Sequence, residues 1–216
     1  MLTDSDINFL NTNLKFYKKL TIEEREIFNS KSFTSIFPKN SAVFSADKEC
    51  SGLIIVVKGT LRAFLNSPEG KEITIYRLLD RDTCILSASC IFKNIHFNIN
   101  IEASEDTEVI ILPSKYLDSL SKSNPILQQY ILELTQSRFS DVMWTIEQLV
   151  FTSFDKRLIS YLQDYNSETI KITHDAIARD LGTAREVVSR MLKYFEKEGM
   201  VKLSRGTINI IDLKKN

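Results

Sequence analysis

The sequence predicts an α+β protein with three parts in chain order. An antiparallel β-roll or jelly roll with flanking helices comes first, a long helix follows, and a winged helix-turn-helix ends the chain. Three observations lead to this fold class. Short β-rich runs fill residues 33–112, an uninterrupted helical pattern follows Pro125, and a glycine separates two short helical patterns near the C-terminus. We place the three parts at residues 1–124, 125–150 and 151–216.

The N-terminal part begins with two short helices and continues as strands. Thr3–Asn13 and Thr21–Asn29 are the predicted helices, and the Thr-Ile-Glu-Glu segment that opens the second is a capping box. Turn signals such as Lys58–Gly59 separate the β-rich runs that follow. The predicted strands are Ser41–Phe44, Leu53–Val57, Thr60–Leu65, Glu72–Leu78, Asn98–Glu102 and Glu108–Leu112. Many short strands at this spacing are typical of a sandwich or a barrel.

A single long helix is predicted from Pro125 to Phe151. Pro125 suits the first helical position, with Asn124 as its cap, and no further Pro or Gly interrupts the segment. An apolar seam along this helix can pack on the protein's own barrel, or it can join two chains as a parallel homodimer. We favour the homodimer because a helix about 40 Å long exceeds what one small barrel covers, with Met143 and Trp144 packing back on the barrel. The seam consists of Leu127, Ile131, Leu134, Phe139, Val142, Ile146 and Leu149.

Two short helices joined by a tight turn are predicted after Thr173. Thr173 is a plausible N-cap of the first helix, and Gly182 occupies the position where helices end in a left-handed backbone. Thr183 and Glu186 then form a Thr-x-x-Glu capping box that opens the second helix. Gly199 ends that helix. Together with a hairpin over residues 201–211 that turns at Arg205–Gly206, the pattern indicates a winged helix-turn-helix.

The second of these helices has one apolar side and one polar side. At about 100° per residue, its apolar residues share one sector and its polar residues share the opposite one. The apolar set is Val187, Val188, Met191, Leu192 and Phe195, and the polar set is Arg185, Glu186, Ser189, Arg190, Lys193 and Lys197. One side can therefore pack on a core while the other side offers hydrogen-bond donors and acceptors to DNA.

The polar side suits the edges of base pairs in the major groove. Arg donates two hydrogen bonds to guanine, Glu accepts from cytosine, and Ser serves a base or a phosphate. We assign base reading to Arg185, Glu186, Ser189 and Arg190, and backbone contacts to Thr173, Thr183, Lys193, Lys197, Lys202 and Arg205. Alternatively, Glu186 only closes its capping box, and Arg185 and Arg190 are solvated charges, or Arg190 pairs with Glu186 at i,i+4.

The segment from Thr183 to Val201, TAREVVSRMLKYFEKEGMV, resembles the recognition helix of the CRP/FNR family of bacterial transcription regulators. It departs from the family pattern at Val187, where Thr is usual. The resemblance implies base contacts by Arg185, Glu186 and Arg190. The E-x-x-S-R spacing is similar to the FNR branch, which implies a half-site with a TGA core, such as TTGAT. It also implies a homodimer on double-stranded DNA with an inverted-repeat operator, and contact with RNA polymerase if the protein is an activator.

The same resemblance implies that the barrel is a double-stranded β-helix with an effector pocket, which holds cyclic AMP in CRP. The nucleotide site of the family uses a Gly-Glu pair for the ribose and an Arg-Ser pair for the phosphate. Here Arg81 and Asp82 stand in place of Gly-Glu, and Phe97 and Asn98 in place of Arg-Ser. Because a cyclic phosphate without its Arg lacks a charge-assisted partner, we expect a different, unknown small effector. The candidate pocket residues are Arg81, Asp82, Thr83, Cys84, Phe97 and Asn98.

The cysteines and histidines give a second sensing hypothesis. Cys84 and Cys90 flank a five-residue segment, while Cys50 lies far off in sequence. They are small buried hydrophobic residues, a redox pair, or ligands to a metal or haem. An iron–sulfur cluster needs four Cys ligands, and a zinc site of the usual kind also lacks ligands, so we expect no metal site. His96 is a remote candidate for a haem ligand, and His174 is expected to be solvated or packed.

Composition limits the class of protein further. The 216 residues carry no net charge, but residues 151–216 hold 12 Lys+Arg against 9 Asp+Glu, which is the sign expected for a DNA-binding part. No run of 18 apolar residues and no signal peptide are visible, so we expect a cytoplasmic protein without membrane contact. No catalytic motif is visible either, and we expect no enzyme. The alternative function is a cyclic-nucleotide- or small-molecule-binding regulatory module that acts through protein partners.

Overall fold

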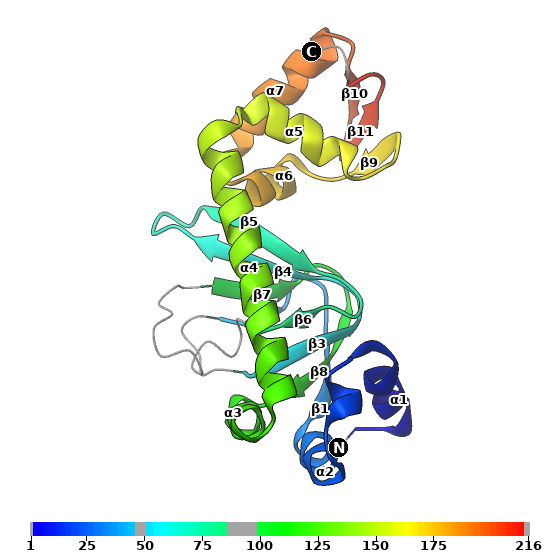
Figure 1. Ribbon diagram of the computed structural model, residues 1–216. Coiled ribbons are helices and arrows are strands. Elements are labelled where there is room, and N and C mark those ends of the chain that lie inside the picture. The colour runs from blue at the N-terminus through cyan, green and yellow to red at the C-terminus, as the bar shows by residue number, and fades with distance from the viewer. Residues whose placement is uncertain (1, 46–50, 86–98, 214–216) are drawn as a thin grey trace. The chain divides into compact units, whose positions relative to one another are not determined.

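The computed structural model of the protein describes residues 2–45, 51–85 and 99–213. The chain forms two compact units (Figure 1). The N-terminal unit comprises Met1–Phe64 and Ile75–Val142, and the C-terminal unit comprises Leu65–Thr74 and Met143–Asn216. Each unit has its own core, so we describe them one at a time.

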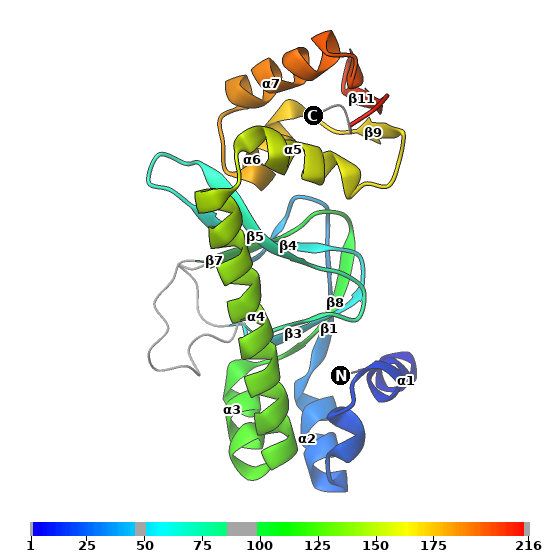
Figure 2. The same ribbon diagram turned by 45° about the horizontal axis from the view of Figure 1, so that its top comes forward.

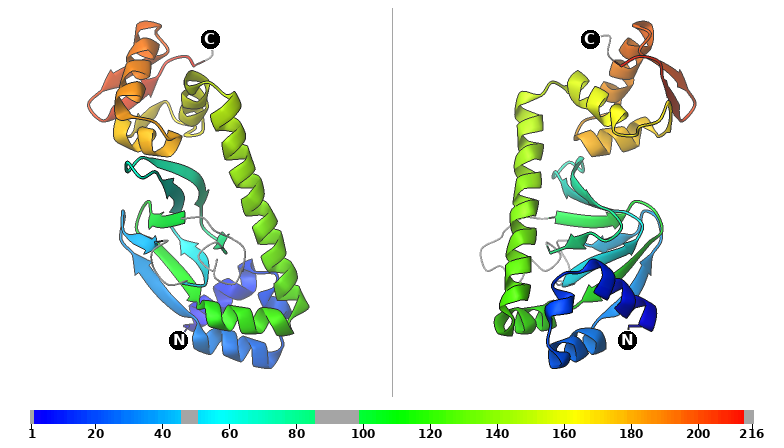
Figure 3. Two further views of the ribbon diagram at one scale, coloured as in Figure 1. Left: turned by 90° about the vertical axis from the view of Figure 1, so that its left-hand side faces the viewer. Right: turned by 45° about the vertical axis from the view of Figure 1, so that its right-hand side comes forward.

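The N-terminal unit opens with the helices α1 (Asp4–Asn13) and α2 (Ile22–Lys31), joined through the short 3₁₀ helix η1 (Tyr17–Lys19). Both α-helices begin with a capping box, and the box at Thr21 confirms the interpretation of the sequence. A third helix, α3 (Ser114–Ser123), was not predicted. These helices gather at one end of the strands (Figure 3).

Eight strands form two four-stranded sheets, with the orders β1-β8-β3-β6 and β2-β7-β4-β5. All of their residues belong to the N-terminal unit except the end of β4 and the start of β5. The strands are β1 (Phe33–Phe37), β2 (Ala42–Phe44), β3 (Leu53–Lys58), β4 (Leu61–Asn66), β5 (Glu72–Leu78), β6 (Thr83–Cys84), β7 (Ile99–Ala103) and β8 (Thr107–Leu112). The six predicted strands are confirmed to within two residues, and β1 and β6 were missed. The antiparallel pair of β3 and β8 lies at the centre of its sheet, where Leu53–Val56 and Val109–Leu112 are buried. The predicted antiparallel β-roll is therefore present.

The long helix α4 (Pro125–Phe151) is present as predicted, and its start packs within the N-terminal unit. Asn124 caps it, because Asn124 Oδ1 accepts hydrogen bonds from the backbone N–H groups of Ile126 and Leu127, both at 3.0 Å. The Tyr130 hydroxyl donates to Thr83 Oγ1 at 2.9 Å. The beginning of α4 is thereby attached to β6.

The apolar seam of α4 divides into a buried part and an exposed part. Leu127 and Ile131 are buried inside the N-terminal unit, so the expectation that they join two chains is wrong for these two residues. Met143 and Trp144 were expected to pack on the barrel but are 48% and 62% exposed. The large apolar residues of α4 that remain exposed are Ile126, Leu132, Phe139, Met143, Trp144, Ile146, Leu149, Val150 and Phe151.

The C-terminal unit contains the predicted winged helix-turn-helix (Figure 2). Its elements are α5 (Phe154–Gln163), β9 (Thr169–Lys171), α6 (His174–Leu181), α7 (Arg185–Lys197), β10 (Val201–Ser204) and β11 (Thr207–Ile210). The strands form one sheet in the order β10-β11-β9. The sequence predicted α6, α7 and the β10–β11 hairpin but missed α5 and β9. Leu158 and Leu162, four residues apart, are the signal by which α5 can be found.

A buried ion pair joins two neighbouring strands of the β-roll. Arg62 Nε on β4 lies 2.9 Å from Glu102 Oε1 on β7, and the two side chains are 4% and 17% exposed. The Arg62 guanidinium also lies over the Phe64 ring, 4.1 Å from its centroid. Because both charges are withdrawn from water, each depends on the other far more than the partners of a surface pair do.

We predict that Glu102→Gln lowers the free energy of unfolding by about 3 kcal/mol, because a buried guanidinium then loses its carboxylate. Urea unfolding followed by circular dichroism measures this loss. Asp118→Asn is the control, since the Asp118–Lys122 pair is exposed and is worth about 0.5 kcal/mol or less. Equal losses in the two variants would contradict the prediction.

Candidate DNA interface

The turn between α6 and α7 is set by two local signals. Thr173 caps α6, with its Oγ1 accepting from the Ala176 backbone N–H at 3.1 Å. The helix ends at Gly182, whose φ of 66° and ψ of 42° lie in the left-handed region that residues with a Cβ rarely adopt. Both features confirm the interpretation of the sequence. The chain therefore reverses within a few residues and starts a second helix at once.

The predicted capping box at Thr183 is not formed. The backbone N–H of Thr183 donates to the Ala178 carbonyl at 3.0 Å, which keeps Thr183 inside the turn. The extended N-cap conformation passes to Ala184, which has no capping side chain. Arg185 and Glu186 are consequently the first two residues of α7. A carboxylate in the first turn is favourable there because the N-terminal end of a helix carries a partial positive charge.

Apolar packing fixes which side of α7 faces outward. Val188, Leu192 and Phe195 are fully buried, in one core with Ile177 and Ala178 of α6. On the opposite side, Arg185, Glu186, Arg190, Lys193 and Lys197 are exposed and Ser189 is half-buried. A row of charged and polar groups thus projects from a helix whose other side is held in the core.

Two side chains of helix α5 form hydrogen bonds with α6. The Tyr161 hydroxyl donates to Asp180 Oδ2 at 2.5 Å, and Arg157 Nη1 donates to the Leu181 carbonyl at 3.0 Å. Burial, and then the neighbouring Asp180 carboxylate, raise the pKa of Tyr161, so its phenol stays a donor. The second contact satisfies a carbonyl at the end of α6. Neither contact could be predicted from the sequence, because α5 itself was missed.

The base-reading candidates differ in how firmly they are held. Arg185 Nε lies 3.6 Å from Asp175 Oδ2, but both side chains are more than 60% exposed, so water and salt screen this pair. Within the described ranges, no ion pair joins Glu186 to Arg190. The exposed charges of the first two turns of α7 are therefore available to an incoming ligand.

Ser189 is held by a side chain from the other helix. His174 Nδ1 and Ser189 Oγ lie 2.8 Å apart, which joins the start of α6 to the middle of α7. Burial, and then the nearby Arg185 guanidinium, lower the pKa of His174 below its usual value, while Asp175 acts in the opposite sense. The imidazole is therefore neutral at pH 7. His174 was expected to be merely solvated or packed, and the distance between it and Ser189 could not be read from the sequence.

A side-chain hydrogen bond from α7 adds to the apolar core that α7 shares with the wing. Glu196 Oε1 accepts a hydrogen bond from the backbone N–H of Leu203 at 2.8 Å. Lys202 on β10 and Arg205 in the turn of the hairpin are both exposed. Two cations thus project from the hairpin that follows α7, at positions where the sequence predicted contacts with the DNA backbone.

Comparisons with known proteins agree with this geometry. Residues 35–124 match the cyclic nucleotide-binding domain family, and residues 156–215 match the Crp-like helix-turn-helix domain family. A crystal structure from Eubacterium rectale, of a protein assigned as a transcriptional regulator of the CRP/FNR family, is 41% identical with a TM-score of 0.91. That match covers 94% of this chain and 96% of the other. The protein belongs to the CRP/FNR family.

Curated relatives are more distant, and their matches also cover most of this chain. The global nitrogen regulator of Nostoc sp. strain PCC 7120 is 24% identical over 186 residues, which is 81% of this chain and 83% of the relative. The cyclic AMP receptor protein of Thermus thermophilus is 24% identical over 195 residues, or 88% and 89% of the two chains. This chain is thus a DNA-binding transcription regulator of the CRP/FNR type. None of its described helices is both long and apolar enough to cross a bilayer.

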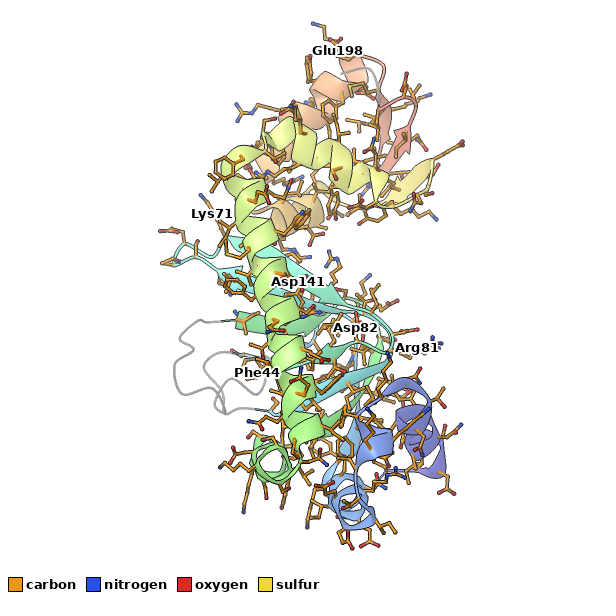
Figure 4. The ribbon with its side chains drawn as sticks, in the orientation of Figure 1. Phe44, Lys71, Arg81, Asp82, Asp141 and Glu198 are labelled. Carbon is orange, nitrogen blue, oxygen red and sulfur yellow. The ribbon has the colours of Figure 1, made fainter. Side chains whose placement is uncertain are left out.

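In this CRP/FNR regulator, the residues predicted to line an effector pocket separate into two groups. Arg81 and Asp82 lie in the turn between β5 and β6 (Figure 4). Arg81 is exposed with a φ of 75°, and Asp82 Oδ2 accepts from the Leu79 backbone N–H at 2.8 Å. Thr83 and Cys84, in contrast, are buried. The remaining sensor candidates, Phe97, Asn98 and Cys90, lie outside the described residues, as do Cys50 and His96.

The sequence missed a cluster of polar side chains around Cys84. The Tyr76 hydroxyl lies 3.8 Å from Cys84 Sγ, and the Arg138 guanidinium of α4 lies over the Tyr76 ring, 4.7 Å from its centroid. Burial, and then the neighbouring Cys84, raise the pKa of the Tyr76 phenol well above its usual value. Arg138 also pairs with Asp141 at 3.1 Å. The cluster therefore links the β-roll to α4.

We predict that Thr173→Ala destabilises the helix-turn-helix by about 1 kcal/mol, because the first turn of α6 then loses its side-chain acceptor. Thr173→Ser keeps that acceptor and should unfold like the native protein. Urea unfolding followed by circular dichroism measures both effects. If the Ser variant loses as much stability as the Ala variant, the threonine methyl group, and not the cap, is what matters.

Proposed function

We propose that this CRP/FNR regulator binds an inverted-repeat operator as a homodimer and reads each half-site with the first two turns of α7. The observation that carries this proposal is the exposed row of Arg185, Glu186 and Arg190 on a helix whose opposite side is buried. A recognition helix needs this combination because its rotation must be fixed before its side chains can meet particular bases.

The chemistry of the row supports readout from the major groove. Arg185 and Arg190 can each donate two hydrogen bonds to a guanine, and Glu186 can accept one from a cytosine amino group. Their spacing with Ser189 is similar to that of the FNR branch, so the proposed half-site has a TGA core of the TTGAT type. Lys193, Lys197, Lys202 and Arg205, with Thr173 and Thr183, are proposed to contact the DNA backbone.

The exposed apolar side chains of α4 support the homodimer. Phe139 is 66% exposed and Ile146 is 47% exposed, and further large apolar residues follow as far as Phe151. An unpartnered apolar stripe of this length on one helix suits a second copy of the same helix. A two-fold dimer places two recognition helices about one turn of DNA apart, which requires an inverted repeat. RNA polymerase is a further partner if the protein activates transcription.

We propose that a small effector or a redox change in the cyclic nucleotide-binding domain controls DNA binding, and that this effector is not cyclic AMP. Residues 82–98 contain neither Glu nor Arg, so the usual ribose and phosphate partners of a cyclic nucleotide are missing there. Cys84 is buried beside Tyr76, where burial restrains its reactivity. Control of this kind requires an effector that favours one of two conformations.

We predict that Arg190→Ala loses discrimination at one base pair of the half-site by about 1–3 kcal/mol, because one bidentate contact disappears. Fluorescence anisotropy on an inverted TTGAT repeat, and on single-base variants of it, measures this loss.

Lys202→Ala is the matched control for a backbone contact. It should weaken binding to all sequences alike and reduce the salt dependence by about one counterion. If Arg190→Ala also weakens every sequence equally, Arg190 contacts a phosphate and does not read a base.

We predict that Phe139→Glu converts the dimer into monomers, because a carboxylate then replaces an exposed ring at the proposed seam. Sedimentation equilibrium measures the change, and operator affinity should fall at least tenfold, which is about 1.4 kcal/mol. Ile36→Glu is the control, since Ile36 is 71% exposed but lies on β1. A dimeric Phe139→Glu protein would place the dimer interface elsewhere.

A further inference from the structure

One hydrogen bond connects the two helices of the helix-turn-helix through side chains. His174 Nδ1 lies 2.8 Å from Ser189 Oγ, across 15 positions of sequence. Both residues are half-buried, whereas Arg185, Glu186 and Arg190 are exposed. The bond is thus better protected from water than the charges beside it, and it can persist when DNA approaches.

The direction of this bond decides what Ser189 can offer to DNA. A serine hydroxyl has one proton to donate and two lone pairs that accept. If Ser189 donates its proton to Nδ1, the Ser189 oxygen can only accept hydrogen bonds from DNA, which suits the amino groups of adenine and cytosine. If Nδ1 carries the proton, Ser189 accepts from the ring, and its own proton becomes available to guanine or thymine oxygens.

The charges around His174 set which arrangement is populated. Arg185 from α7 and Asp175 from α6 are the charged groups that act on the ring, and they form the exposed pair described above. Burial and Arg185 lower the pKa of His174, so the ring is neutral at pH 7 and above. A neutral imidazole nitrogen is a stronger base than a hydroxyl oxygen, which favours donation from Ser189. Protonation at lower pH makes both ring nitrogens donors and reverses the bond.

We propose that His174 is a positioning residue that fixes the hydrogen-bonding polarity of Ser189 and thereby the base that Ser189 selects. In the neutral form, Ser189 accepts from an exposed base amino group. In the protonated form, Ser189 donates to a base carbonyl oxygen. This inference rests on the proposed function, because it requires that Ser189 meets base edges in the operator.

Base preference measured at two pH values tests the proposal. Competition anisotropy on the full-length protein would use operators with each base in turn at every half-site position, at about pH 8 and at an acid pH at which nitrogen-15 shifts show the His174 ring to be protonated, because the pKa of His174 lies below its usual value. We expect one position to prefer a base with an exposed amino group at the higher pH. The same position should move toward a carbonyl-bearing base at the lower pH. A preference at that position that does not change with pH would overturn the proposal.

Two amide variants separate the ring nitrogens. His174→Asn places an amide near the position of Nδ1 and does not titrate, so it should keep the preference found at high pH and lose its pH dependence. His174→Gln places the amide near Nε2, out of reach of Ser189. The ratio of affinities for the preferred and the other bases should therefore fall about three- to tenfold, which corresponds to the loss of one hydrogen bond. Ser189→Ala should lose the same preference at the same position, and combining it with His174→Gln should add nothing further.

Other outcomes identify which idea fails. Uniform weakening of all sequences by His174→Gln would make His174 a backbone or folding residue and overturn the proposal. Additive effects of the His174 and Ser189 variants would do the same. If native protein shows no base preference at all, the proposed function itself is wrong. If Arg190→Ala loses discrimination while His174→Gln behaves as native, only the present inference fails.

A measurement without DNA checks the bond directly. Nitrogen-15 shifts of the imidazole in the free protein distinguish a ring whose Nδ1 accepts from one whose Nδ1 is protonated. We expect an accepting Nδ1 at neutral pH, and a change in its shift in Ser189→Ala. A protonated Nδ1 at neutral pH, or a ring that is insensitive to Ser189→Ala, would overturn the proposal even if the variants bind DNA poorly.

Discussion

The apolar contact between α6 and α7 is the constraint on which DNA recognition depends. Successive residues of a helix differ by about 100° in direction, so burying Val188 and Leu192 determines where every other side chain of α7 points. The left-handed backbone at Gly182 brings the two helices close enough for that contact. Without this apolar contact, Arg185 and Arg190 would remain charged and exposed but would have no fixed direction toward DNA.

Electrostatics acts locally in this protein, because the whole chain has no net charge. The Arg185–Asp175 pair is exposed and weakly held, so Arg185 can exchange Asp175 for a DNA group at little cost. The His174–Ser189 bond is partly withdrawn from water and is more expensive to break. The helix-turn-helix thus combines charges that can rearrange with a hydroxyl whose orientation is held.

Local sequence signals were sufficient where a residue acts on its own neighbours. The caps at Asn124 and Thr173 and the left-handed turn at Gly182 require only a few adjacent residues, and all three could be predicted. Thr183 shows the limit, because its backbone N–H bonds back to α6 and the capping pattern that it shares with Glu186 stays unused. The strand β6 has two residues and offers too short a pattern to detect. The contact of His174 with Ser189 depends on how α6 packs on α7, which no local pattern encodes.

Periodicity along α4 could predict a helix with an apolar seam but not what covers that seam. Leu127 and Ile131 are buried by their own β-roll, whereas Phe139 is exposed. One residue before Phe139, and therefore about 100° round the helix, Arg138 lies over the Tyr76 ring of the β-roll. Around residues 138 and 139, helix α4 therefore contacts the β-roll with one side and exposes the ring of Phe139 on another. The contact between Tyr76 and Arg138 is therefore one point at which the proposed effector would reach α4. The proposed control of DNA binding requires that the effector stabilises one conformation of the protein over another.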